Sequence, residues 1–149
     1  MCIAILLFAL WLIKSFLVQP FVLLDENMEP TLKKEGVYFI DRISYRFRDP
    51  RRGEIVVFRT TEVPPLYFVK RIVGSAGERI KMEEGAVFIN GKLFNEPYTK
   101  VNSNWNFEEV SIKEGRVYVI DDSRALWPGP YSHTKVAYKN IVGRIMGIK

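Results

Sequence analysis

Residues 67–74 read Tyr-Phe-Val-Lys-Arg-Ile-Val-Gly, a run of β-branched and aromatic side chains that follows Pro64-Pro65 and ends at a glycine. A run of this length between turn residues is typical of a β-strand. Successive side chains of a strand point to opposite faces, so Phe68, Lys70 and Ile72 are expected to share one face. The pattern therefore places a lysine among large apolar side chains.

Two interpretations of Lys70 follow from this position. Burial disfavours the charged ammonium and lowers the pKa of a lysine, which turns its amine into a usable general base. The alternative is a lysine near a strand end whose head group reaches water, as most lysines do.

Similar short runs lie on both sides of this strand, separated by turn signals. The clearest turn is Asn90-Gly91 between two apolar runs, because both residues of that hairpin tolerate positive φ. No stretch after residue 24 keeps a helical apolar period over three turns. We therefore expect a mainly β, antiparallel domain, with a polar, exposed loop at 95–109. The expected strands are 36–41, 54–59, 66–73, 86–89, 92–94, 116–120 and 141–148.

The amino end differs from the rest, since residues 1–13 read MCIAILLFALWLI without a polar side chain. A helix continued to Gln19 would reach ~28 Å, and Pro20 would end it. We interpret 1–19 as a transmembrane anchor in contact with membrane lipid, and 20–149 as an extracytoplasmic β domain on a single-pass cell-membrane protein. A cleaved secretory signal would need a basic start and small residues before the cut. A buried helix is the other alternative, but this segment is apolar on all faces.

The composition limits the kinds of catalytic and binding site that the chain can form. The chain has 149 residues, 48% of them hydrophobic, a net charge of +5, one cysteine and one histidine. Cys2 alone excludes an internal disulfide framework and a cysteine-based zinc site. His133 alone disfavours a histidine relay or metal cluster, and we expect it at the surface or in a loop. There is no phosphate loop or dinucleotide motif, so we expect no metal, no cofactor and no nucleic-acid partner.

Several motifs in order carry a resemblance to a known family. They are FVLLDENMEPTLKKEG (21–36), RRGEIVVFR (51–59), YFVKRIVGSAGERI (67–80), VYVIDDSR (117–124) and NIVGRI (140–145). Together they resemble type I signal peptidases over nearly the whole chain. This resemblance implies a membrane-anchored serine protease of the S26 peptidase family, with a Ser–Lys dyad and a β-rich domain outside the cytoplasm. Such enzymes cut signal peptides after small residues, with the substrate lying extended as an added strand.

Matched position by position, Lys70 corresponds to the general base of the family, and Arg71 to the basic residue after it. Asp122 and Arg124 correspond to the D and R of the family's GDNR box, and together with Arg71 they are expected to be structural. The expected substrate-binding residues are Met28, Pro30, Phe68, Val69 and Trp127.

The nucleophile does not match. The family has serine where this chain has Asn27, and a carboxamide cannot form the acyl-enzyme. Glu26 replaces a glycine beside it, which places a negative charge near the expected oxyanion. Trp127 stands where a serine would support the lysine. So many coordinated changes argue against a single engineered inactivation, although an engineered Asn27 stays an alternative.

Three hypotheses follow. The first is a non-catalytic protein that binds an extended peptide, similar to the degenerate signal-peptidase-like proteins of Gram-positive bacteria that assist pilus assembly. Its partner would be a signal peptide, a preprotein or a pilin precursor, and Asn27 would accept a hydrogen bond from Lys70. The second is an active signal peptidase with an altered or engineered site, in which Ser75, Ser123 or Ser132 replaces the nucleophile. The third is a membrane-attached β domain without a shared role.

Overall fold

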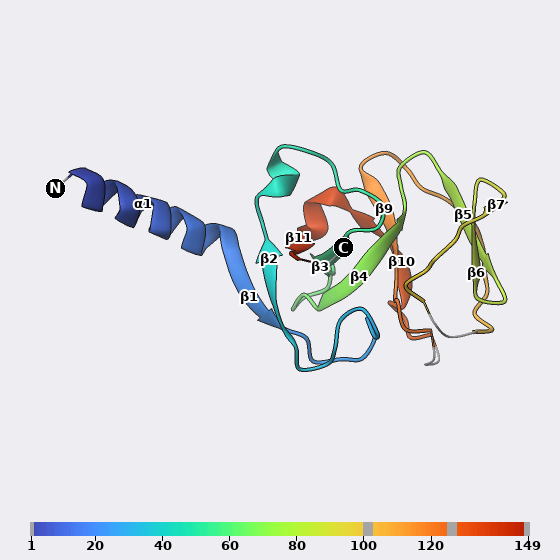
Figure 1. The fold of residues 1–149 in the computed structure, drawn as a ribbon. Coiled ribbons are helices and arrows are strands. Elements are labelled where there is room, and N and C mark those ends of the chain that lie inside the picture. The colour runs from blue at the N-terminus through green and yellow to red at the C-terminus, as the bar shows by residue number, and fades with distance from the viewer. Residues whose placement is uncertain (1, 100–102, 125–127, 148–149) are drawn as a thin grey trace.

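The structure is a computed structural model that describes residues 2–99, 103–124 and 128–147, with one helix and two β-sheets (Figure 1). The chain begins with helix α1 (Cys2–Leu17) and continues almost entirely as strands and two short 3-10 turns, η1 (Ser44–Arg46) and η2 (Tyr138–Asn140). The strands are β1 (Val18–Val22), β2 (Val37–Asp41), β3 (Ile55–Arg59), β4 (Tyr67–Gly74), β5 (Arg79–Glu83), β6 (Ala86–Ile89), β7 (Lys92–Leu93), β8 (Phe107–Ser111), β9 (Arg116–Ile120), β10 (His133–Ala137) and β11 (Ile141–Ile145).

The larger sheet has seven strands in the order β1-β2-β11-β3-β4-β9-β10, and the smaller has four in the order β7-β6-β5-β8. Every pairing is antiparallel, from the β1–β2 hairpin to the β5–β8 pair. The prediction of a mainly β, antiparallel domain is therefore confirmed.

The amino-terminal helix is shorter than the sequence predicted. α1 ends at Leu17, and Val18 and Gln19 instead pair with Asp41 and Ile40 of β2. Pro20 lies inside β1, which is tolerated because β1 is an edge strand of the sheet. Within the described ranges, no helix combines the length and apolar character needed to cross a bilayer.

The predicted boundaries after the helix are partly confirmed. The Asn90-Gly91 hairpin forms as expected, with φ of 51° and 78° at its two turn residues. The exposed loop expected at 95–109 is wrong in part, because Trp105 is only 5% exposed and Phe107 begins strand β8. The final strand ends at Ile145, three residues before the predicted end. Strands β1, β5, β8 and β10 were not predicted.

The central strands of the larger sheet are covered on both faces. Val57 and Val69 pack in a cluster that also holds Met28 and Leu32, from the segment after β1. The residues that alternate with them along the strands point to the other face of the sheet. There they form a second cluster, made of Val56, Phe58, Ile72, Val117, Val119 and Val136. A third cluster, centred on Val73, Ile80 and Tyr118, joins the two sheets. β4 is therefore the strand at which all three clusters meet.

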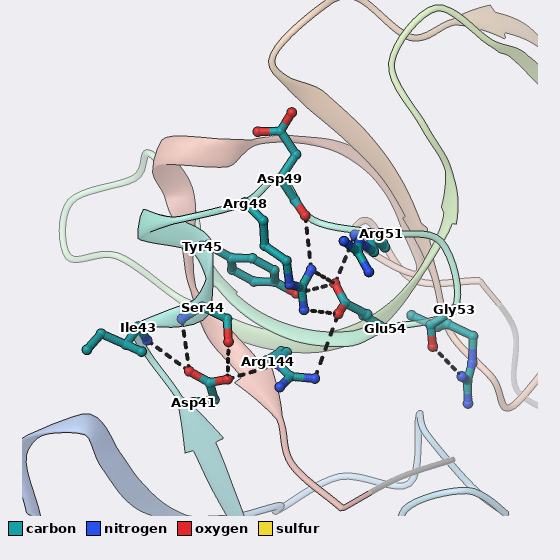
Figure 2. A network of polar contacts seen from close by, with 11 residues as sticks. Asp41, Ile43, Ser44, Tyr45, Arg48, Asp49, Arg51, Gly53, Glu54 and Arg144 are labelled. Carbon is teal, nitrogen blue, oxygen red and sulfur yellow. Dashed lines mark hydrogen bonds and ion pairs between the residues drawn. The ribbon is translucent and has the colours of Figure 1, made fainter. Parts of the chain in front are cut away.

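Two carboxylates organise the segment between β2 and β3 (Figure 2). Asp41 accepts hydrogen bonds from the backbone N–H of Ile43 and Ser44, each 3.0 Å long, and from Arg144 Nε at 2.9 Å. Glu54 accepts from the Tyr45 hydroxyl at 2.9 Å and from the Arg48 guanidinium. These bonds tie η1 to both β2 and β11.

Candidate functional site

Lys70 is a buried cation with a carboxylate partner. It lies in β4, is 1% exposed, and shares its face with Phe68 and Ile72 as the alternation predicted. Its Nζ donates to Oδ1 of Asp121 and lies 5.4 Å from the centre of the Phe68 ring. The interpretation in which the head group reaches water is therefore wrong.

Asp121 comes directly after β9, where the register pairs Arg71 with Ile120. Its backbone N–H donates to the carbonyl oxygen of Ser132 at 2.9 Å. Burial raises the pKa of the Asp121 carboxyl to about 6, while Lys70 and the Ser132 hydroxyl oppose this rise by favouring the charged form. Sequence reasoning missed Asp121, although it occupies the glycine position of the GDNR box. An acid at a position where the pattern has glycine was the available signal.

Asn27 is half-buried in the turn after β1. Its carbonyl oxygen accepts the backbone N–H of Ser123 at 2.9 Å, and its own N–H donates to Asp25 Oδ1 at 3.1 Å. In the described part of the chain, Lys70 donates to Asp121 and forms no hydrogen bond with Asn27. The expected Lys70–Asn27 hydrogen bond is therefore wrong, because the nearer carboxylate is the stronger acceptor.

Arg71 points to the opposite face of β4 and has its own acidic partner. Its Nε and Nη2 donate to the two oxygens of Asp122 at 2.7 and 2.6 Å, a bidentate pair. The Thr31 hydroxyl also donates to Asp122, at 2.6 Å, and the Tyr98 ring centre lies 4.0 Å from the guanidinium carbon. These contacts fix the turn that carries Asn27 against the end of β9.

Arg124 links the turn after β9 to the smaller sheet. Its Nη1 donates to Glu96 at 2.7 Å and to the carbonyl oxygen of Gly85 at 2.9 Å. Both side chains are buried, with 1% and 6% exposure. The positions of Arg71, Asp122 and Arg124 are consistent with the structural role that the resemblance implies.

The predicted substrate contacts lie in different environments. Met28 and Val69 are core residues, 0% and 4% exposed, and offer no side-chain surface to a ligand in this structure. Pro30 is exposed, and Phe68 is half-buried with its ring centre 4.8 Å from that of Tyr131. Trp127 lies outside the described residues.

His133 is not a surface or loop residue. It lies in β10, half-buried, with Nδ1 2.8 Å from the Tyr118 hydroxyl and its ring stacked on Phe107. Burial lowers the pKa of His133, and the nearby Lys70 ammonium lowers it further. These contacts make it part of the junction between the sheets.

The buried lysine on β4, the turn that carries Asn27 and the turn after β9 form one constellation, and the sequence around them matches a known family. The profile of the family described as signal peptidase, peptidase S26, matches residues 1–146. The chain belongs to this signal peptidase family. Its relatives include a probable signal peptidase I-2 of Synechocystis sp., 34% identical over 75% of this chain and 54% of the relative. Signal peptidase I P of Bacillus subtilis subsp. natto is 31% identical over 82% of this chain and 71% of the relative.

A solved structure supports the fold. The crystal structure of a signal peptidase I from Enterococcus faecalis superimposes with a TM-score of 0.51 and 21% identity, covering 65% of this chain and 97% of that one. The chain spans about half the length of the Synechocystis relative, 54%. Membership of the signal peptidase family and its β fold are thus established for this chain.

Proposed function

We propose that this chain is a signal-peptidase-like protein that binds an extended peptide at a membrane surface without hydrolysing it. The observation that carries this proposal is the buried Lys70–Asp121 pair, in the turn where the Ser123 N–H also binds the carbonyl oxygen of Asn27. A general base must accept a proton from the nucleophile, whereas the Lys70 Nζ is engaged in a hydrogen bond to a carboxylate that the family pattern lacks. The residue at the nucleophile position has no hydroxyl to activate.

The scaffold for peptide binding is retained. Arg71, Asp122 and Thr31 hold the Asn27 turn to the end of β9, and the central strands stay packed on both faces. An extended peptide binds mainly through backbone hydrogen bonds, which need a strand edge and not a nucleophile. We propose a preprotein or pilin precursor as the partner, with a role in assembly or as a chaperone for surface pili.

The direct test is a cleavage and binding assay with a preprotein that carries an Ala-x-Ala site. The purified protein in neutral detergent should retain the preprotein without cutting it. Asn27→Ser should remain inactive, because Lys70 stays paired with Asp121. Cleavage by a contaminating protease would not depend on Lys70 and would persist in all variants. The cleavage measured with Lys70→Met therefore gives the background rate.

A second candidate function is an active peptidase that uses Ser132. The observation in its favour is that the Ser132 hydroxyl interacts with Asp121, the partner of Lys70. The Ser132→Ala variant separates the two functions, with exposed Ser111→Ala on β8 as the matched control. Cleavage by the unmodified protein that disappears in Ser132→Ala and persists in Ser111→Ala establishes this second function and refutes the first.

We also propose that α1 attaches the protein to a membrane, on the extracytoplasmic side. Apolar side chains are exposed all round the helix, with Ile3, Leu6, Phe8 and Trp11 each at 60% or more. Figure 1 shows the helix projecting away from both sheets, so the fold itself leaves these side chains uncovered. The protein should float with phosphatidylcholine vesicles in a density gradient, and Leu6→Lys/Phe8→Lys should abolish this. Equal flotation of the variant would contradict membrane attachment through α1.

A further inference from the structure

A pocket lies where α1 meets the larger sheet. Its volume is about 1020 Å³, and its wall includes Leu17 at the end of α1 and Gln19 in β1. Much of its lining is apolar and comes from four strands and the turn beside them, through Phe21, Ile40, Val57, Ile141 and Val142. The pocket therefore begins at the residue where the exposed apolar helix ends.

The polar part of the lining carries charge of one sign. Four cationic residues border the pocket, namely Arg42, Arg46, Arg59 and Lys139, and none of the described lining residues is acidic. Arg42 donates to the Gln19 amide oxygen at 3.3 Å, which leaves its charge uncompensated. In the described ranges of the chain, the ion pairs do not include Arg46, Arg59 or Lys139. Like charges held together without counter-charges favour the binding of an anion.

The carboxylate network of Figure 2 orders the backbone of the turn after β2, which carries two of the arginines. Asp41 and its bonds to the backbone of Ile43 and Ser44 fix the chain between Arg42 and Arg46. The β3–β4 pairing, which sets Arg59 opposite Tyr67, fixes the third arginine. The cationic border is thus built on backbone that is already ordered before any ligand binds.

We propose that this pocket binds the phosphate headgroup of an anionic phospholipid from the membrane that receives α1. This inference rests on the proposed membrane attachment and names a ligand for it. An apolar lining beneath a cationic border matches a molecule with a charged phosphate next to hydrocarbon. A small soluble anion would use the arginines and leave the apolar lining without a partner. The continuity of the pocket with the end of α1 places it at the level of the headgroups.

The test measures partition of the full chain onto vesicles of phosphatidylcholine alone or of an equal mixture with phosphatidylglycerol. The unmodified protein should bind the anionic vesicles more tightly than the neutral ones. Arg46→Gln/Arg59→Gln should weaken anionic binding about 25-fold and leave neutral binding unchanged, since each cation near an anionic surface contributes ~1 kcal/mol, about fivefold. The side chains of Arg46 and Arg59 form no hydrogen bonds within the described residues, so the fold should tolerate their loss.

The control removes the same charge from the far sheet and the turn beside it, with Lys92→Gln/Lys113→Gln, both exposed. Equal weakening by the control, or none by Arg46→Gln/Arg59→Gln, overturns the proposal. Calorimetry with inorganic phosphate in neutral detergent forms a second arm. Tight phosphate binding that needs Arg46 and Arg59, without any preference between the vesicles, identifies free phosphate as the ligand and also overturns it. Failure to bind vesicles of either composition refutes membrane attachment itself, whereas equal binding to both refutes only the headgroup site.

Discussion

The pairing of Lys70 with Asp121 makes a quantitative prediction about folding stability. Both side chains are only 2% exposed, so water cannot solvate the remaining charge if its partner is removed. Breaking a buried pair by truncating one member costs about 3–5 kcal/mol, because the other charge is left uncompensated in the interior. We therefore expect Lys70→Met to lower the free energy of unfolding by about 3–5 kcal/mol. Asp121→Asn should cost much less, because the raised pKa of this carboxyl means that the fold favours its neutral form.

The double variant Lys70→Met/Asp121→Asn distinguishes this explanation from lost packing. It leaves no buried charge, so it should cost less than Lys70→Met alone, which leaves the Asp121 carboxylate without a partner. The exposed pair of Lys34 with Glu26, 46% and 52% exposed, is the matched control, and Lys34→Met should leave the free energy of unfolding nearly unchanged.

Urea unfolding at about pH 8, followed by tryptophan fluorescence, measures all four values, with an unchanged denaturant slope as the check for two-state behaviour. This pH lies above the Asp121 pKa of about 6, so the carboxylate is charged in the folded protein. A cost below about 1 kcal/mol for Lys70→Met would refute the reasoning, since the lysine would then behave like a solvated surface residue. A double variant that costs the sum of the singles would show that the two residues act independently.

Three further predictions concern pH and packing. Burial opposes ionisation of Asp41, yet its hydrogen bonds lower its pKa to about 2, so the stability that the carboxylate contributes above pH ~4 should be lost as pH falls through 2. Acid titration of unfolding should show this loss, and it should be absent in Asp41→Asn. The pKa of Asp121 is raised to about 6, so its effect on stability has the opposite pH dependence. Stability should fall as pH rises from ~4 to ~6, and Asp121→Asn should remove that slope. A Cβ at Gly143 would lie 2.4 Å from the carbonyl oxygen of Asp41, so Gly143→Ala should cost about 1–3 kcal/mol by urea unfolding. An equal cost for Gly129→Ala, whose Cβ would meet only Ser132 Oγ at 3.6 Å, would contradict this steric cause.

The sequence predicted the face of Lys70 correctly because strand alternation is local. It did not predict the partner, because Asp121 is 51 residues away and the β4–β9 register depends on the whole sheet. Only the family pattern offered a signal, and that signal was an acid in place of glycine. Site chemistry that depends on long-range pairing was therefore beyond a reading of local periodicity.

The missed strands have a physical explanation of their own. β8 and β10 are edge strands, and most of their side chains are exposed or only partly buried, so their sequences, FEEVS and HTKVA, are rich in polar residues. β5 reads RIKME, in which Ile80 and Met82 alternate with charged residues, and this period of two was available but short. The helix boundary was misplaced for a different reason, since Val18 leaves the helix to pair with Asp41.

The two adjacent ion pairs also bear on how the sheet selects its register during folding. Lys70 and Arg71 point to opposite faces of β4, and the consecutive acids after β9 meet them there, one on each side. A slip of one residue would turn every side chain to the other face and separate both cations from their carboxylates at once. Four charges would then lie in the interior without partners, each at a cost of several kcal/mol. The two ion pairs therefore favour one register of β4 against β9 and disfavour registers shifted by one residue, whether or not the site is catalytic.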